Sequence, residues 1–158
     1  MMRHLLLLAL ICIASLCHAE NFSGKVVGIT DGDTITVLDE QKTEQKVRLA
    51  GIDAPEKNQA YGQRSKQSLS ALIFGKVVMV ETNKRDRYGR NVGKVLLADQ
   101  DVNLEQIRRG MAWFYREYKR ELTTSDQRKY DETESEAKAG QLGLWSDLSP
   151  TPPWTFRK

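Results

Sequence analysis

One arginine and two carboxylates stand within nine residues of each other in the stretch 47–56, as Arg48, Asp53 and Glu56. This stretch runs from strand-like residues into a sharp turn, so both carboxylates are expected on a loop that a metal ion or a substrate can reach. The spacing also has a structural alternative, because an aspartate followed three residues later by a glutamate is the pattern of a helix capping box. The residue types therefore indicate a site, while the pattern alone leaves helix capping open.

The backbone around these residues is predicted from the same stretch. Side chains alternate between the two faces of a strand, so Arg48 is expected to point outward while Leu49 points into the core. Gly51 is expected to break the strand, and Pro55 fixes the backbone dihedral after the turn. The strand before the turn must therefore be positioned by a larger sheet.

Runs of alternating and β-branched residues predict that sheet. Asp31-Gly32 is a strong hairpin-turn signal, with apolar alternation on both sides of it. Three strands joined by short turns favour antiparallel pairing. The five predicted strands cover residues 22–29, 34–38, 45–49, 77–81 and 92–97.

Helical periodicity occurs in three places. Between the third and fourth strands the apolar residues fall on one helical face, and Gly75 is expected at the end of that helix. A short helix is expected over 103–109, capped by Asn103, and a strongly charged helix over 125–139. The face of the first helix comprises Tyr61, Ser65, Leu69, Leu72 and Ile73.

This order of elements predicts an α+β fold that is mainly β, with about three helices. Five strands with a helix between the third and fourth fit a five-stranded Greek-key barrel of the OB type. A small sheet must close or leave its edges open to aggregation, which also favours a barrel. A fold of this kind does not by itself specify a function.

Residues 1–19 are predicted to be a secretory signal peptide. The apolar run over 5–16 is too short to cross a bilayer, and Ala19 offers a cleavage site. An uncleaved membrane anchor is the alternative. Both cysteines and both histidines of the chain lie in this segment. The mature protein is therefore expected in an oxidising compartment, secreted or periplasmic, without disulfides and with no stable membrane association.

The rest of the chain is predicted to be one domain over 20–148, followed by an extended, proline-containing tail over 149–158. The net charge of +3 falls to about +2 without the segment 1–19. Affinity for an anion must therefore come from where the charges lie. With no cysteine or histidine left after cleavage, hard oxygen ligands remain, which disfavours a zinc or copper site.

Three stretches together resemble the signature stretches of the staphylococcal nuclease family. They are Asp31-Gly32-Asp33-Thr34, then Arg48 through Glu56, then Asp86-Arg87-Tyr88-Gly89-Arg90. Each stretch alone is a weak signal, whereas their order and spacing on this strand pattern are specific. The resemblance covers the chain from about residue 25 to residue 145.

The resemblance implies a nuclease that cleaves DNA and RNA phosphodiesters with a bound Ca²⁺. It assigns the metal to the carboxylates of Asp33 and Asp53 and to the backbone carbonyl of Ala54, which are the hard oxygen ligands that Ca²⁺ prefers. The two arginines, Arg48 and Arg90, would bind the scissile phosphate through their planar guanidinium groups.

The resemblance also implies roles for residues around this centre. Glu56 would orient or deprotonate the attacking water. Arg87 and Tyr88 would contact a terminal phosphate of the bound nucleotide, and Tyr118 would lie near the base, with Tyr115 an equal candidate for that position. Two positions depart from the family pattern: Ala54 stands where the family has threonine, and Arg87 where it has lysine.

Two other functions fit parts of the sequence. A non-catalytic OB-fold module could hold single-stranded nucleic acid or an oligosaccharide, although it would not need the charged residues of a catalytic site. A structural envelope protein would account for residues 1–19 and leave those charged residues unexplained. The prediction is a monomeric nuclease with low sequence specificity, acting on single-stranded DNA and with RNA as a second candidate substrate.

Overall fold

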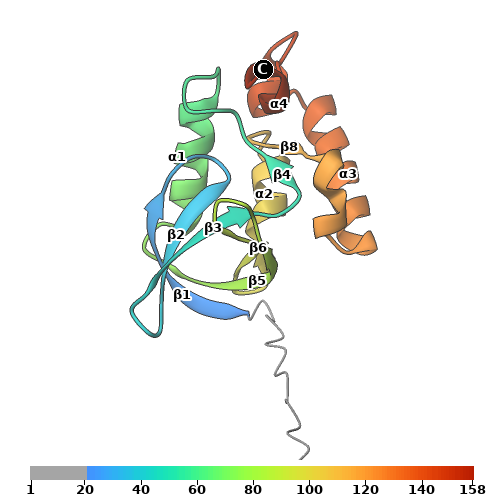
Figure 1. Ribbon diagram of the computed structural model, residues 1–158. Coiled ribbons are helices and arrows are strands. Elements are labelled where there is room, and N and C mark those ends of the chain that lie inside the picture. The colour runs from blue at the N-terminus through green and yellow to red at the C-terminus, as the bar shows by residue number, and fades with distance from the viewer. Residues whose placement is uncertain (1–20) are drawn as a thin grey trace, which may run out of the picture.

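A five-stranded barrel forms the centre of the protein, whose computed structural model describes residues 21–158 (Figure 1). The antiparallel neighbours run in the order β3-β2-β1-β5-β6, and a parallel pairing of β3 with β6 closes the ring. A two-residue strand, β7, pairs antiparallel with the end of β6. The strands are β1 (Phe22–Ile29), β2 (Thr34–Asp39), β3 (Glu44–Leu49), β5 (Val77–Arg85), β6 (Asn91–Leu97) and β7 (Gln100–Asp101). The predicted α+β barrel and its five strands are confirmed.

Alternation along the strands fills the barrel with aliphatic side chains. In β2, Ile35 and Val37 are fully buried, and in β3 Val47 and Leu49 are fully buried while Arg48 lies between them on the other face. Burying one such side chain contributes about 1.5–3 kcal/mol. The interior is completed by Val26, Val78, Val80, Val92 and Val95. The barrel therefore fixes the ends of β2 and β3, from which the site residues emerge.

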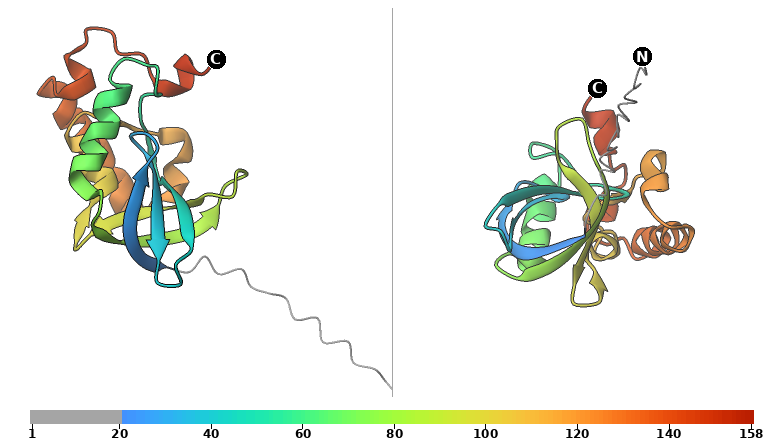
Figure 2. Two further views of the ribbon diagram at one scale, coloured as in Figure 1. Left: turned by 90° about the vertical axis from the view of Figure 1, so that its left-hand side faces the viewer. Right: turned by 60° about the horizontal axis from the view of Figure 1, so that its bottom comes forward.

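Helices cover one side of the barrel (Figures 1 and 2). Helix α1 (Gly62–Ile73) buries Ser65, Leu69, Leu72 and Ile73, four of the five residues of the predicted face, and packs against β1 and α2. The fifth, Tyr61, is the N-cap residue and lies outside the helix. It ends at Phe74, and Gly75 follows with φ of 75°, a left-handed conformation that favours glycine. Within residues 21–158, no helix is both long and apolar enough to pass through a membrane.

The cap of the second helix differs from the prediction. Helix α2 (Val102–Arg108) is capped by Asp101, whose carboxylate accepts the N–H of Leu104 at 3.0 Å. Asn103 lies inside the helix and is fully buried. Its side chain is therefore not a cap, because it forms hydrogen bonds with barrel backbone instead. Helix α3 (Thr124–Ala139) is capped by Thr123 and packs on α2 and on β8.

A short second sheet leads the chain out of the barrel. Gly51, with φ of 69°, ends β3 as predicted, and a Cβ at this position would come within 2.4 Å of Leu122. The chain then forms β4 (Ile52–Asp53), which pairs with β8 (Trp113–Phe114). The 3₁₀ helix η1 (Arg116–Glu121) follows β8 and supports this turn, because Glu121 accepts the N–H of Gly51 at 3.0 Å. The sequence did not predict β4 or β8.

The segment 149–158 is not simply extended, contrary to the prediction. After the 3₁₀ helix η2 (Gly143–Ser146) it runs back over the molecule and forms the short helix α4 (Pro153–Phe156). Pro152 and Pro153 start this helix, because their fixed φ suits a first helical turn. The predicted signal peptide, 1–19, lies outside the described residues.

Candidate active site

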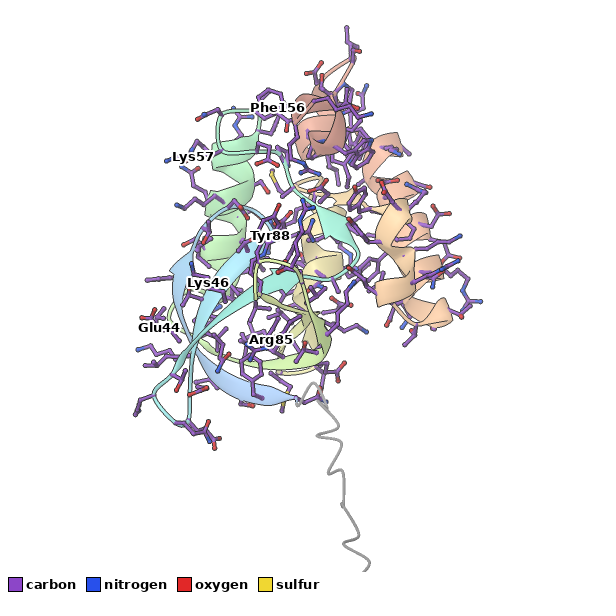
Figure 3. All side chains as sticks on the ribbon, in the orientation of Figure 1. Glu44, Lys46, Lys57, Arg85, Tyr88 and Phe156 are labelled. Carbon is purple, nitrogen blue, oxygen red and sulfur yellow. The ribbon has the colours of Figure 1, made fainter. Side chains whose placement is uncertain are left out.

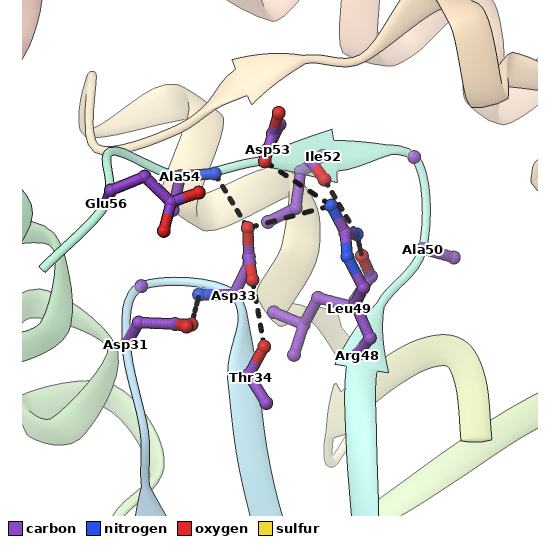
Figure 4. Close-up of polar contacts among 12 residues, drawn as sticks. Asp31, Asp33, Thr34, Arg48, Leu49, Ala50, Ile52, Asp53, Ala54 and Glu56 are labelled. Carbon is purple, nitrogen blue, oxygen red and sulfur yellow. Dashed lines mark hydrogen bonds and ion pairs between the residues drawn. The ribbon is translucent and has the colours of Figure 1, made fainter. Parts of the chain in front are cut away.

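Asp33 occupies the turn between β1 and β2, and its side chain is held from two sides. Its Oδ2 accepts the backbone N–H of Ala54 at 2.7 Å, and its Oδ1 accepts the hydroxyl of Thr34 at 3.0 Å (Figure 4). The residue is only 6% exposed. The turn is shaped by Asp31, whose carboxylate accepts the N–H of Asp33 at 3.0 Å. The predicted Asp-Gly turn thus presents a buried, oriented carboxylate.

Asp53 reaches the same place from β4. It is 1% exposed, and its Oδ1 lies 3.4 Å from Nη2 of Arg48. Because Asp53 lies in a strand and α1 begins at Gly62 with Tyr61 as its N-cap, the capping-box alternative for Asp53 and Glu56 is wrong. Burial raises the pKa of Asp53, and hydrogen bonds from Arg157 offset this only in part.

Arg48 joins the two aspartates. Its Nη2 lies 3.9 Å from Asp33 and 3.4 Å from Asp53, while its Nη1 donates to the carbonyls of Leu49 and Ile52 at 3.1 and 3.0 Å (Figure 4). Burial alone would lower the pKa of Arg48, but the charges of the two aspartates raise it. The guanidinium therefore stays charged and is fixed in orientation by three hydrogen-bond acceptors, together with the ion pair to Asp33.

Two buried amides of α2 hold the turns that carry these carboxylates. Asn103 donates to the carbonyls of Ala50 and Gly93, each at 3.1 Å, and so fixes the chain just before β4. Gln106 donates to the carbonyl of Gly32 at 2.8 Å and so fixes the turn of Asp33. Removing the amide of Asn103 would leave the carbonyl of Ala50 without this partner, and removing that of Gln106 would do the same to Gly32; a buried group left unpaired typically costs about 1–3 kcal/mol.

Glu56 lies at the open side of this centre. Its side chain is 37% exposed, and its backbone N–H donates to the side chain of Gln59 at 3.0 Å. Oε1 accepts a hydrogen bond from Nη1 of Arg157 at 2.7 Å. We name Asp31, Asp33, Asp53 and Glu56 together the carboxylate cluster. Glu56 is the member that combines access to solvent with a place beside the buried pair.

The second predicted arginine is held elsewhere. Arg90 lies in the loop between β5 and β6, residues 86–90, which we name the hairpin loop and which projects from the barrel (Figure 2, left). Its Nε donates to Asp86 at 2.7 Å, and this bond holds the pKa of Asp86 below its usual value despite partial burial. Among residues 21–158, Arg90 forms no hydrogen bond or ion pair with Asp33, Asp53 or Glu56.

Arg87 and Tyr88 are both exposed in the hairpin loop, and Figure 3 labels Tyr88. Tyr88 is 68% exposed, and its hydroxyl accepts a hydrogen bond from Arg87 at 2.7 Å. The guanidinium of Arg90 lies 5.4 Å from the centre of the Tyr88 ring. The three predicted substrate-contacting residues of the loop therefore contact one another, and the structure does not bring them to the carboxylate cluster.

Tyr118 lies on η1 and is 45% exposed, with Lys84 over its ring at 5.7 Å. Its ring packs edge-to-face on Tyr115, with 4.7 Å between centroids. The plane of Tyr115 stacks in turn on Trp154, at 5.1 Å and an interplanar angle of 9°. The two tyrosines that were equal candidates for a base contact are thus neighbours, and one of them is covered.

The donor set fits a hard cation. Asp33 and Asp53 approach one nitrogen of Arg48, so their oxygens converge, and within residues 21–158 the carbonyl of Ala54 accepts no hydrogen bond. In that same range, no group of three or more His, Cys, Asp or Glu side chains is arranged to hold a metal. A metal here would therefore take two carboxylates and complete its shell from backbone, water and substrate oxygens.

Two site residues were missed by the sequence reasoning. Asp31 was interpreted only as a turn residue, yet burial and the charge of Asp33 raise its pKa to about 7. The Asp-x-Asp spacing could have indicated it. Arg157 contacts Asp53 and Glu56 from a segment about a hundred residues away in sequence, 104 and 101 respectively. No local pattern marks such a contact.

Comparisons with known proteins show the family to which the chain is similar. A family model described as "Staphylococcal nuclease homologue" matches residues 46–147. A Haemophilus influenzae protein named "Uncharacterized endonuclease" is 40% identical over 152 residues, which cover 96% of this chain and 82% of the relative. The "Micrococcal nuclease" of Shigella flexneri is 42% identical over 159 residues, covering 95% of this chain and 88% of the relative. "Protein ParB" of Escherichia coli is 40% identical over an alignment of 167 positions, gaps included, which covers 100% of this chain and 91% of the relative.

Proposed function

This chain belongs to the staphylococcal nuclease family and is a nuclease, and we propose that it is an exported, Ca²⁺-dependent endonuclease of low sequence specificity. Its substrate would be DNA, single-stranded DNA first, with RNA as a second candidate substrate. One observation carries the proposal. Two buried carboxylates, Asp33 from the turn before β2 and Asp53 from β4, converge beside the fixed guanidinium of Arg48.

Asp33, Asp53 and the carbonyl of Ala54 would hold the Ca²⁺. When bound there, the ion would supply positive charge for a phosphate oxygen and make a bound water more acidic. The family's threonine is Ala54 here, and its backbone atoms are those the proposal uses. Asp33 is already oriented by Thr34 and Ala54, so little of its side-chain freedom remains to be lost on binding.

The arginines would bind the scissile phosphate. Attack of water on phosphorus places additional negative charge on the non-bridging oxygens, and a fixed guanidinium can donate to two of them. Each such donor typically accounts for about a hundred- to thousandfold in rate. Arg48 is positioned for this by backbone carbonyls. Arg90 would have to exchange its bond with Asp86 for the phosphate when substrate binds.

Glu56 would act on the attacking water. As the water oxygen bonds to phosphorus, Glu56 takes one of its protons, the bond from phosphorus to the leaving oxygen breaks, and that oxygen takes a proton from solvent. A positioned base contributes about 10²–10⁴ in rate. Its exposure supports this role, because the attacking water must come from solvent.

Contacts further out would hold the polynucleotide. Arg87 and Tyr88 would bind a phosphate beyond the scissile one, and Tyr118 would lie against a base. These side chains are exposed at the hairpin loop and on η1. Phosphate contacts and stacking tolerate any sequence, so these residues would give the low sequence specificity that we propose.

Hydrolysis of labelled single-stranded DNA and RNA by the chain 20–158 tests the proposal. We expect cleavage with Ca²⁺ and its loss on addition of a chelator. Cleavage that persists after chelation would reject the metal, and no cleavage with any divalent ion would reject the assigned substrate. Glu56→Gln should abolish turnover while binding of single-stranded DNA persists. This separates a nuclease from a binding module, whose properties would not change.

Export is proposed from the sequence of residues 1–19. Cell fractionation of the full-length chain tests it, with N-terminal sequencing of the exported form. We expect a mature protein that begins at Glu20 and is released by disrupting the outer envelope or found in the medium. A full-length protein retained in the membrane fraction would support the uncleaved anchor instead.

A further inference from the structure

Arg157 places a positive charge inside the proposed metal site. It follows α4, and its Nη1 donates to Oδ1 of Asp53 at 3.1 Å while its Nη2 donates to Oδ2 at 2.8 Å. The same Nη1 donates to Oε1 of Glu56 at 2.7 Å. Both oxygens of one proposed ligand and one oxygen of the proposed base are thus bound by a single guanidinium. These bonds raise the pKa of Arg157 further.

A guanidinium and a divalent cation cannot both occupy this position. A metal ion on Asp53 needs a lone pair that Arg157 now uses, and the two cations would repel each other at contact distance. Oε1 of Glu56 is occupied by Nη1 of Arg157 at 2.7 Å, so the attacking water cannot approach this oxygen from the side on which the guanidinium lies. While Arg157 binds Asp53 and Glu56, neither residue can therefore take the part that the proposed reaction gives it.

Aromatic packing holds the segment 150–158 in place. Trp154 stacks on Tyr115 at 5.1 Å and packs edge-to-face on Trp113 at 5.5 Å. Gln59 donates to the carbonyl of Thr151 at 2.5 Å. Such aromatic pairs contribute about 0.5–1.5 kcal/mol each beyond the area they bury. Trp154 also covers the ring face of Tyr115.

The segment nevertheless has little regular structure of its own. The side chain of Arg157 is 40% exposed, and α4 has four residues, too few for a helix that is stable by itself. A cavity of about 170 Å³ remains beneath the segment. It is lined on one side by Pro55, Gln59 and Tyr61, and on the other by Pro150, Thr151 and Phe156.

We propose that the segment 150–158, named here the latch segment, is a built-in competitor of the metal. Arg157 occupies the cation position of Asp53 and Glu56 in the resting protein and leaves it when Ca²⁺ binds. This inference rests on the proposed function for the identity of the ion. The latch segment would then control the metal affinity. A site that is open only part of the time has an apparent affinity equal to its intrinsic affinity multiplied by the open fraction.

Isothermal titration of the metal-free chain 20–158 with Ca²⁺ tests the inference. Arg157→Ala should bind Ca²⁺ about tenfold more tightly than the unaltered chain, as for a site that is open about one-tenth of the time. Lys158→Ala is the matched control, since it removes a neighbouring positive charge from the same segment and should change the affinity less than about twofold. Asp53→Asn should abolish binding and so identify the site.

Trp154→Ala separates a latch from a simple charge effect. It keeps the charge of Arg157 but removes the docking of the segment, so the latch predicts tighter Ca²⁺ binding here too. Equal affinities in the unaltered chain, Arg157→Ala and Trp154→Ala would overturn the inference while leaving the nuclease proposal intact. Tighter binding in Arg157→Ala alone would also overturn it, in favour of long-range charge. No Ca²⁺ binding in any of these proteins would overturn both.

Discussion

The carboxylate cluster and the hairpin loop contain the two arginines proposed to bind phosphate, and they are built in different ways. Arg48 is fixed by two backbone carbonyls and two aspartates that come from the turn before β2 and from β4. Arg90 is held by Asp86, four residues away in the same loop. The first arginine belongs to the folded core, whereas the second belongs to a local loop.

Because of this difference, the free-energy cost of ordering Arg48 is met on folding, whereas part of that of ordering Arg90 is met on substrate binding. The order of Arg48 is established on folding, because α2, β3 and β4 must all be in place for it. The contacts of the hairpin loop are internal, so substrate binding must reorganise them and part of the binding energy is used there. Changes at Arg48 should therefore affect both stability and catalysis, and changes in the hairpin loop should affect function alone.

The largest effect is expected from Arg48→Ala. The variant should lower kcat with single-stranded DNA by about a thousandfold, because it removes a fixed donor to the phosphate. It should also lower the free energy of unfolding of the metal-free protein by about 3 kcal/mol, since Asp33 loses its buried counter-ion and Asp53 retains only Arg157. Steady-state kinetics and urea denaturation measure the two effects. Arg108→Ala, which removes an exposed arginine paired with Glu105 on α2, is the control.

A folded, fully stable Arg48→Ala protein would contradict the idea that this arginine belongs to the core. Arg48→Lys refines the test. It keeps the charge but cannot reproduce the planar arrangement of donors, so stability should recover more than kcat does.

Arg90→Ala should lower kcat by about a hundredfold while changing the free energy of unfolding by less than about 0.5 kcal/mol. The reason is that its partners lie within the hairpin loop and no buried group is left unpaired. The same two measurements apply, with Arg108→Ala again as the control. Equal stability losses in the Arg48 and Arg90 variants would show that the contrast between the two regions is false.

Local features of the fold could be predicted from the sequence, and features set by distant contacts could not. The strands, the face of α1 and the left-handed glycines at the ends of elements follow from periodicity and turn chemistry. The pairing of β4 with β8 is two residues long and joins segments sixty residues apart, so no local pattern marks it. Asn103 has the residue type of a cap, yet Asp101 caps α2, because the side chain of Asn103 instead donates to Ala50 after β3 and to Gly93 of β6.

The candidate site shows the same division. Asp33, Arg48, Asp53 and Glu56 were predicted together because their stretches are recognisable in sequence. Arg157 was not predicted, because its position depends on Trp154 packing against aromatic residues of β8 and just before η1. The prolines of this segment instead suggested an extended tail. Sequence reasoning found the residues that resemble a known pattern and missed the cation that this fold supplies itself.

The pH dependence of stability offers a test confined to the carboxylate cluster. Asp31 has a pKa near 3.8 in the unfolded chain and about 7 in the folded protein, so the folded state binds its proton more tightly. Its contribution to stability is therefore present below pH about 4 and is lost as the pH rises through about 7. Urea denaturation of the metal-free protein should show a decrease of up to about 4 kcal/mol over this range, since each pKa unit corresponds to about 1.4 kcal/mol.

Asp31→Asn should remove most of this decrease, because the amide does not titrate. Asp147→Asn, which changes an acid near η2 outside the cluster, is the control and should retain it. A pH dependence that is the same in the Asp31 variant would assign the decrease to other carboxyls. The hairpin loop should make no such contribution. The pKa of Asp86 is lowered, and its stabilisation is therefore lost only toward acid pH.

The smallest effect is expected at the exposed end of the hairpin loop. Tyr88→Ala and Arg87→Ala should each raise KM for single-stranded DNA about three- to fivefold and leave kcat and stability unchanged. Both side chains are exposed and would contact a phosphate beyond the scissile one, so they add uniform binding. The increase in KM should shrink at high salt for the arginine variant, because its contact is ionic. A decrease in kcat without a change in KM would instead place these residues next to the reacting phosphorus.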